Sequence, residues 1–143
     1  MANDNRQPAG VLRNGVLTVH LVAQQVTWYP EAEDGPQKIV EAFGEAGNAP
    51  RVPGPLLRIP LGTTIDAAIT NTLADTLAVL GLRSRSDTIW IAPDSTERVR
   101  FMPKSAGSFL YAAGEKLTTG VRFGGTHGQL VGALIVDAAR AAP

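Results

Sequence analysis

Few residues in this chain of 143 could do chemistry: it has two histidines, His20 and His127, and no cysteine. The lack of cysteine excludes disulfide scaffolds, thiol catalysis, thiolate zinc sites and copper centres that need a cysteine ligand. Two imidazoles from one chain rarely hold a catalytic ion, although symmetry-related chains could add further ligands at an interface. The sequence therefore predicts no metal site that a single chain completes.

The two histidines occupy different settings. His20 alternates with the apolar residues Leu17, Val19 and Leu21, which predicts a half-exposed ring hydrogen-bonded to a neighbour rather than a metal ligand. His127 lies in the glycine-rich stretch 124–128, which predicts a loop, and loops do carry sites. This stretch is not a phosphate loop, because a strand rather than a helix is expected after it. Both histidines stay candidate ligands for a metal held across an interface.

The remaining candidates for chemistry are carboxylates and tryptophans. Asp94 and Glu97 resemble an acid–base pair, but a solvated hairpin explains them better, as it does the arginines that follow. Trp28 and Trp90 are either core anchors or parts of a partner-facing surface, and the core is favoured. The sequence thus predicts no catalytic residue and no cofactor-binding residue.

Charge and hydropathy limit the partners. The chain has 13 Lys and Arg against 13 Asp and Glu, and a neutral surface attracts phosphate backbones and anionic lipids weakly. No window reaches the roughly 18 apolar residues of a membrane span. The polar opening residues lack the apolar region of a signal peptide, which does not exclude one removed earlier. We expect neither nucleic acid nor a membrane as partner.

A period of two in hydropathy predicts that β-strands position these residues. Runs at 17–21, 65–70 and 98–101 alternate apolar and polar residues, as half-buried strands do, while residues 129–137 are apolar at both parities, as in a central strand. Residues 38–46 are interpreted as a strand or irregular loop, because Gly44 and Gly47 would cut a helix short. Frequent turn signals, with 15 Gly and 10 Pro, complete the pattern. Eight or nine short strands in an antiparallel Greek-key β-sandwich or barrel follow.

The length fits one domain. We expect a flexible N-terminal segment at 1–12, one domain at 13–138 and a C-terminal tail at 139–143, which could lead into a linker.

Several segments carry a family resemblance by their order and spacing. They are Val-Pro-Gly-Pro-Leu-Leu-Arg-Ile-Pro-Leu-Gly-Thr-Thr at 52–64, Thr-Asn-Thr-Leu at 70–73, Gly-Leu-Arg at 81–83, Ala-Gly-Ser-Phe-Leu-Tyr at 106–111 and Gly-Ala-Leu-Ile-Val-Asp at 132–137. In this order they resemble the N-terminal cupredoxin domain of bacterial, laccase-type multicopper oxidases, over residues 10–138. The resemblance implies an all-β, cupredoxin-like fold. Residue chemistry agrees: Pro-Gly-Pro suits a sheet margin, and Gly132 allows a close approach of a ring or backbone.

The chain departs from the family where copper would bind. Family members carry a His-x-His pair before Gly-Leu-Arg and another after the Gly-Thr-Tyr-x-Tyr strand, which contribute to a type 2 and type 3 copper cluster. The matching positions here are Ala78, Leu80, Ala112 and Gly114, whose side chains cannot donate to a metal. The type 1 centre would need a cysteine as well. We therefore expect no copper or other cofactor bound by this chain.

Three functional hypotheses follow. The preferred one is a non-catalytic structural or interaction module that pairs with other cupredoxin domains or with itself. The second is a fragment or subunit of a multicopper oxidase, a copper-dependent oxidoreductase, whose copper is bound by another domain or chain. The third is a small-molecule binder that uses the hollow at the vacated ligand positions. The chain alone is not expected to be an enzyme, and the resemblance implies an exported, periplasmic bacterial protein.

Overall fold

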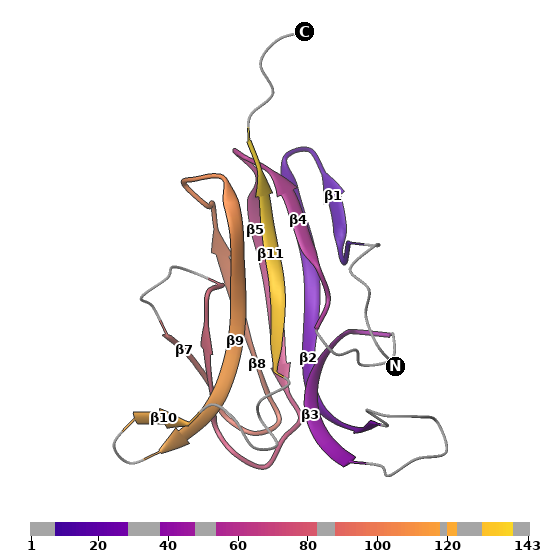
Figure 1. The fold of residues 1–143 in the computed structure, drawn as a ribbon, viewed down its shortest axis with the longest axis vertical. Helices are drawn as coiled ribbons and strands as arrows, with labels where there is room; N and C mark the ends of the chain where they lie inside the picture. The colour runs from indigo at the N-terminus through magenta and orange to yellow at the C-terminus, as the bar shows by residue number, and fades with distance from the viewer. Residues whose placement is uncertain are drawn as a thin grey trace, which may run out of the picture.

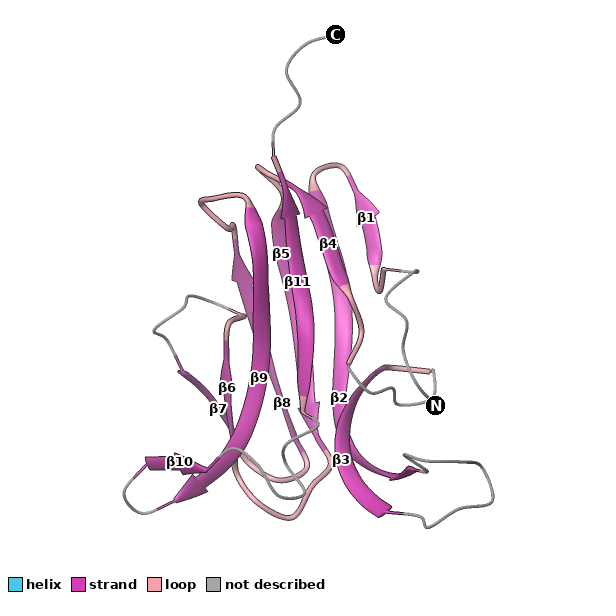
Figure 2. Cartoon of the chain, viewed as in Figure 1, coloured by secondary structure: helices cyan, strands magenta, loops and turns pink. Residues whose placement is uncertain are grey.

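The computed structural model describes residues 8–28, 38–47, 54–82, 88–117, 120–122 and 130–138. Within these ranges the chain is all-β, with strands and no helix, in two sheets that face each other (Figures 1 and 2). The five-stranded sheet contains β1 (Val11–Arg13), β2 (Val16–Trp28), β3 (Lys38–Glu45), β5 (Thr64–Asn71) and β8 (Ser95–Phe101). The six-stranded sheet contains β4 (Leu57–Pro60), β6 (Leu77–Leu80), β7 (Thr88–Ile91), β9 (Gly107–Leu117), β10 (Gly120–Arg122) and β11 (Val131–Asp137).

The predicted β-sandwich is confirmed, with two differences in detail. The described residues form eleven strands instead of eight or nine, because β1 and β10 have three residues each and show no alternation in the sequence. The sheets are not purely antiparallel: β2 pairs β5, and β4 pairs β11, in parallel. Parallel neighbours need a crossover connection, and here the chain passes to the other sheet between them. Hydropathy alternation does not encode strand direction.

Alternation of side chains builds the core. Every second residue of β5 is buried, and the same holds for the N-terminal half of β2 and for β11. Strand residues two apart point to one face, so both sheets turn their apolar rows inward. Residues 38–45 form β3, which is the strand alternative of the two that the sequence left open for 38–46. The core consists mainly of Leu17, Val19, Leu21, Phe43, Leu57, Ile59, Ile65, Ile69, Leu77, Val79, Leu82, Ile89, Ile91, Val99, Tyr111, Leu130, Leu134 and Val136.

Asn14 and Gly15 join β1 to β2 in a two-residue hairpin. Both have positive φ, 53° and 76°, which is the combination that a type I′ turn requires. Residues 8–12 were expected to be flexible, yet they include the start of β1 and the buried Ala9, whose amide donates to the carbonyl of Leu56. The described fold therefore begins before the predicted boundary at residue 13.

Tyr111 is the largest fully buried side chain among the described residues. Its hydroxyl donates to the carbonyl oxygen of Pro55, and its ring lies 5.4 Å from that of Phe43, centroid to centroid. Burial raises the pKa of the Tyr111 hydroxyl, so the group stays a protonated donor. Gly132 lies opposite Tyr111 on β11, and a Cβ atom there would overlap the ring. The predicted close approach at Gly132 is thereby confirmed.

The margin of the six-stranded sheet is formed by β4, which follows the Pro-Gly-Pro segment as expected and has β11 as its neighbour. β11 is flanked by β4 and β9, in agreement with the predicted central strand, but only its even-numbered residues are buried. Arg58 on β4 donates two hydrogen bonds to the carboxylate of Asp137 on β11, of 2.9 and 3.0 Å. No helix among the described residues is long and apolar enough to span a membrane.

Candidate functional site

The four positions that match copper ligands in the resembled family lie on two neighbouring strands. β6 and β9 are antiparallel, and their register places Ala78 opposite Gly114 and Leu80 opposite Ala112. On these strands Val79, Tyr111 and Ala113 belong to the core. Because side chains alternate across a strand, the four vacated positions lie on the outer face of the six-stranded sheet. They therefore form one compact patch with no donor atoms in its side chains.

Apolar side chains lie around this patch on the outer face. Trp90 on β7 lies opposite Ala78 in the register, and its side chain is 47% exposed. Leu110 on β9 lies opposite Ala133 and is 69% exposed. We call this surface the outer apolar face; it consists of Leu80, Trp90, Leu110, Ala112, Val131, Ala133 and Ile135, whereas Ala78 and Gly114 beside it are buried. Large exposed apolar side chains grouped on one face mark interaction surfaces more often than chance exposure does.

Trp90 is exposed, so the prediction of a core position for it is wrong. Its strand neighbours Ile89 and Ile91 are buried, so alternation directs Trp90 outward. The alternative that the sequence analysis kept open, a partner-facing surface, fits its position. The side chain of Trp28 lies outside the described part of the structure.

His20 is exposed on the outer face of the other sheet. Its Nε2 lies 2.7 Å from the Thr70 hydroxyl, which in turn lies 2.7 Å from the Thr96 hydroxyl. The predicted hydrogen-bonded histidine is thus present, and it is on the opposite sheet from Ala78 and its neighbours. His127 lies outside the described residues. Within the described residues, no three His, Cys, Asp or Glu side chains are grouped to hold a metal ion.

Asp94 and Glu97 are both exposed, as a solvated turn requires. The segment is not a hairpin, however: it joins β7 of one sheet to β8 of the other, and Asp94 has a φ of 58°. Arg98 on β8 forms an ion pair of 3.5 Å with Asp66 across to β5. These side chains form a solvated strand face.

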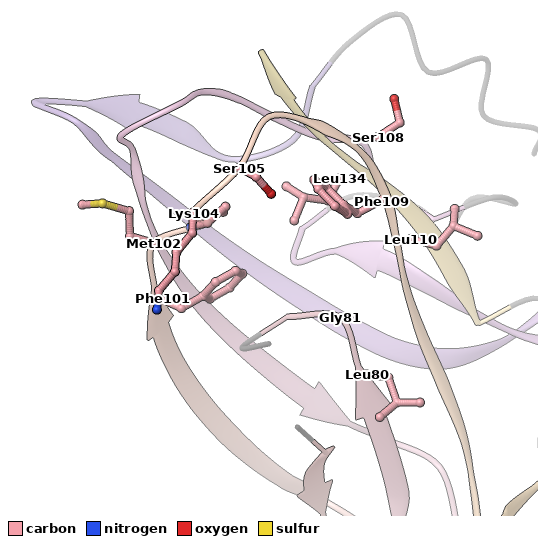
Figure 3. A pocket seen from close by; sticks show the side chains of 11 residues that line it. Leu80, Gly81, Phe101, Met102, Lys104, Ser105, Ser108, Phe109, Leu110 and Leu134 are labelled. Carbon is pink, nitrogen blue, oxygen red and sulfur yellow. The ribbon is translucent and has the colours of Figure 1, made fainter. Parts of the chain in front are cut away.

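One end of the sandwich contains an open pocket of about 900 Å³. It lies beneath the connection between β8 and β9, and Figure 3 shows the side chains around it. The main wall residues are Phe101, Phe109, Leu134, Lys104, Ser105 and Leu110. Leu80 is the only one of the four vacated positions that lines it.

Sequence reasoning did not predict this pocket or the outer apolar face. A signal for the face was present, since residues 129–137 are apolar at both parities and so predict cover on both sides of β11. No such signal exists for the pocket, because its walls come from four separate segments of the chain.

Comparison with known proteins gives structural matches alone. No protein-family profile and no curated protein sequence matches the chain. Among solved structures, a laccase from Pediococcus acidilactici matches with a TM-score of 0.63 and 14% identity, over 96% of this chain and 31% of that one. A multicopper oxidase from Campylobacter jejuni, described as a metallo-oxidase, has a TM-score of 0.62 and 16% identity, over 94% and 29%. A laccase from Botrytis aclada has a TM-score of 0.59 and 22% identity, over 91% and 23%.

These matches establish a cupredoxin-like fold of the multicopper oxidase type. The chain spans roughly a third of each solved structure, between 23% and 39% of their lengths in the cases compared. At identities of 14% to 23%, the likeness concerns the fold and not the activity of those proteins.

Proposed function

We propose that this chain is a non-catalytic, cupredoxin-fold interaction module that packs its outer apolar face against another cupredoxin-type domain and binds no copper itself. One observation carries the proposal. The positions where the resembled oxidases have histidines are aligned across β6 and β9 and hold only hydrocarbon or hydrogen side chains, and two of them, Leu80 and Ala112, are partly exposed on the side of the sheet that carries Trp90 and Leu110. A surface on which apolar groups replace metal ligands can no longer bind the metal. Its apolar groups still favour burial against a partner.

The energetics favour a partner over bare exposure. Burying apolar surface favours an association, and the part of this gain that exceeds the cost of lost translational and rotational freedom appears as affinity. Tryptophan is enriched among the residues that dominate binding energy. Among the described residues five large hydrophobic side chains are exposed, and two of them, Trp90 and Leu110, lie on this face.

The available partner for a first test is a second copy of the chain, as a dimer or trimer. Light scattering coupled to gel filtration should show a mass that rises with concentration. Trp90→Ser combined with Leu110→Lys should leave a monomer at all concentrations, because it removes exposed contacts without touching the core. Leu12→Lys is the matched control, since Leu12 is 49% exposed on β1 of the other sheet and should not affect assembly. A strict monomer for the unaltered chain at high concentration would contradict self-association.

A second candidate function is that of one domain of a copper-dependent oxidase whose copper is held by another domain or chain. The coverage of solved structures supports it, since the matched oxidases are about three times as long. Mass spectrometry of the protein purified from its natural source distinguishes the interaction module from the oxidase domain. A polypeptide near 15.0 kDa supports the module, and a much larger polypeptide supports the oxidase domain.

A ligand bound at the vacated positions has little support among the described residues. Ala78 and Gly114 are buried there, and Leu80 alone lines the open pocket. For location, the resemblance supports an exported bacterial protein. Cell fractionation of the source organism, with recovery in the envelope or the medium, tests this part of the proposal.

A further inference from the structure

The pocket under the connection between β8 and β9 is formed where the two sheets separate at one end of the sandwich. Its volume of about 900 Å³ lies within the range of small-molecule sites, which is about 300–1,000 Å³. Phe101 comes from the end of β8, Phe109 from the start of β9, and Leu134 from β11. In Figure 3 the rings of Phe101 and Phe109 border the space from two sides, with Leu134 beside Phe109.

The apolar walls of the pocket pack against the hydrophobic core but remain partly exposed. Phe101 and Phe109 are in the inward-facing rows of their strands and pack against the core, yet both are only half-buried. Gly81 lies on the opposite side: it has a φ of 89°, and a Cβ atom there would collide with the carbonyl oxygen of Leu110. Only glycine allows the end of β6 to approach β9 this closely. The pocket therefore offers aromatic and aliphatic surface beside a close backbone contact.

The residues that line the pocket carry a positive charge and no negative charge. Lys104 is the one charged residue among those that line it, and no acidic side chain is present there. No hydrogen bond or ion pair joins Lys104 to another described residue. Ser105 adds a hydroxyl group, and Figure 3 shows Ser105 and Lys104 on the same loop, with Lys104 on the side of Phe101. An apolar body with a single negative charge would complement this arrangement.

We propose that this pocket binds a small amphiphilic monocarboxylate, with its apolar body between Phe101 and Phe109 and its carboxylate beside the ammonium group of Lys104. A long flexible lysine stem lets the ammonium follow the carboxylate while remaining in water. The proposed carboxylate site does not rest on the proposed interaction module, because Phe101, Phe109 and Lys104 do not belong to the outer apolar face. Leu80 and Leu110 are the residues it shares with the outer apolar face.

The test is an NMR titration of the full chain with phenylbutyrate and, separately, with the uncharged phenylbutanol, at neutral pH. Phenylbutyrate should shift the amide signals of the β8–β9 connection saturably, and it should bind more tightly than the alcohol. Lys104→Met should weaken phenylbutyrate binding about two- to fivefold, the size of an exposed ion pair, and leave the alcohol unaffected. Arg13→Met, which removes an exposed charge on β1, is the matched control and should change neither affinity.

A second variant tests the position independently of charge. Ser105→Trp places a large ring at the exposed pocket loop and should abolish binding of both compounds while the rest of the spectrum is retained. The proposal is overturned if phenylbutyrate causes no saturable shifts up to about 10 mM. It is equally overturned if the shifts lie on another surface, or if the acid and the alcohol bind alike and Lys104→Met has no effect.

Discussion

At the scale of single residues, the contact between Gly132 and Tyr111 decides how the six-stranded sheet packs. The ring of Tyr111 occupies the space above Gly132, and its hydroxyl satisfies the carbonyl group of Pro55, which comes from the segment before β4. One side chain thus joins β9, β11 and the Pro-Gly-Pro segment. A glycine is needed at position 132 because any Cβ atom would overlap the ring.

Gly132→Ala is expected to destabilise the protein by about 3 kcal/mol, as overpacking in a tight core does. Urea denaturation measures the change in the free energy of unfolding. In a Tyr111→Leu background, where the ring is absent, the same substitution should cost far less, so the two changes should not add. A loss below about 0.5 kcal/mol in the unaltered background would show that the ring moves aside freely.

Residue types predicted that a ring or backbone approaches Gly132 closely, but they did not predict that Trp90 is exposed. Gly132 follows from composition, because a glycine within an otherwise apolar strand points to a close approach. The placement of Trp90 depends on which face of β7 meets the opposite sheet, and a strand of four residues is too short for its alternation to settle this. A preference by residue type therefore gave the wrong answer for Trp90.

At the scale of elements, the register of β6 against β9 is what brings the vacated positions together. A one-residue shift of either strand would turn two of the four toward the core. Directly opposite residues on an antiparallel pair have Cβ atoms about 4.5–5.5 Å apart, which suits two ligands of one metal ion. The register can therefore be tested by restoring ligands.

The double substitution Leu80→His and Ala112→His is expected to create a copper(II) site, because both positions are half-buried and lie opposite each other. Calorimetric titration should show about one copper ion bound per chain, with little binding to the unaltered protein. The control is Leu80→His with Leu110→His, on neighbouring strands but out of register, which should bind more weakly. Equal binding by the two variants would contradict the register.

The pairing of β4 with β11 includes the hydrogen bonds between Arg58 and Asp137. The pKa of Asp137 is lowered in the folded protein, mainly because Arg58 donates hydrogen bonds to its carboxylate. A lowered pKa in the folded state stabilises the protein above the pKa of the unfolded state. This contribution is lost as the pH falls through the folded-state pKa.

Arg58→Gln should return the pKa of Asp137 toward its ordinary value, which an NMR titration of the carboxyl carbon measures. The difference in stability between the two proteins should be present at neutral pH and should vanish at strongly acidic pH. Arg98→Gln is the matched control, because Arg98 pairs with Asp66 on the other sheet. An unchanged titration of Asp137 in Arg58→Gln would show that the ion pair does not persist in solution.

At the scale of the whole molecule, hydropathy alternation and turn residues were sufficient to predict the β-sandwich, because long strands such as β5 show their buried side in the sequence. They could not predict the parallel pairs, which depend on how the chain crosses between the sheets. Of the candidate site, the four vacated positions follow from motif spacing. The outer apolar face and the pocket required the structure, since residues far apart in the chain form them.

The outer faces of the two sheets differ in the side chains that they expose. The five-stranded sheet carries exposed polar groups such as His20 and Arg98 on its outer face, whereas the six-stranded sheet carries Trp90 and Leu110 besides the ion pair of Arg58 and Asp137. This asymmetry between the two outer faces favours a partner on one side of the sandwich. It also separates the described histidine from the positions at which copper would be expected.

The central claim is that this fold acts without copper, and the direct measurement is metal content. The purified chain is incubated with copper(II), desalted and analysed by elemental analysis, with a phenolic dye assay for oxidase activity alongside. The account predicts copper far below one ion per chain and no turnover of the dye. Retention of nearly one copper per chain would contradict it, and would make His20 and His127 ligands at an interface between chains.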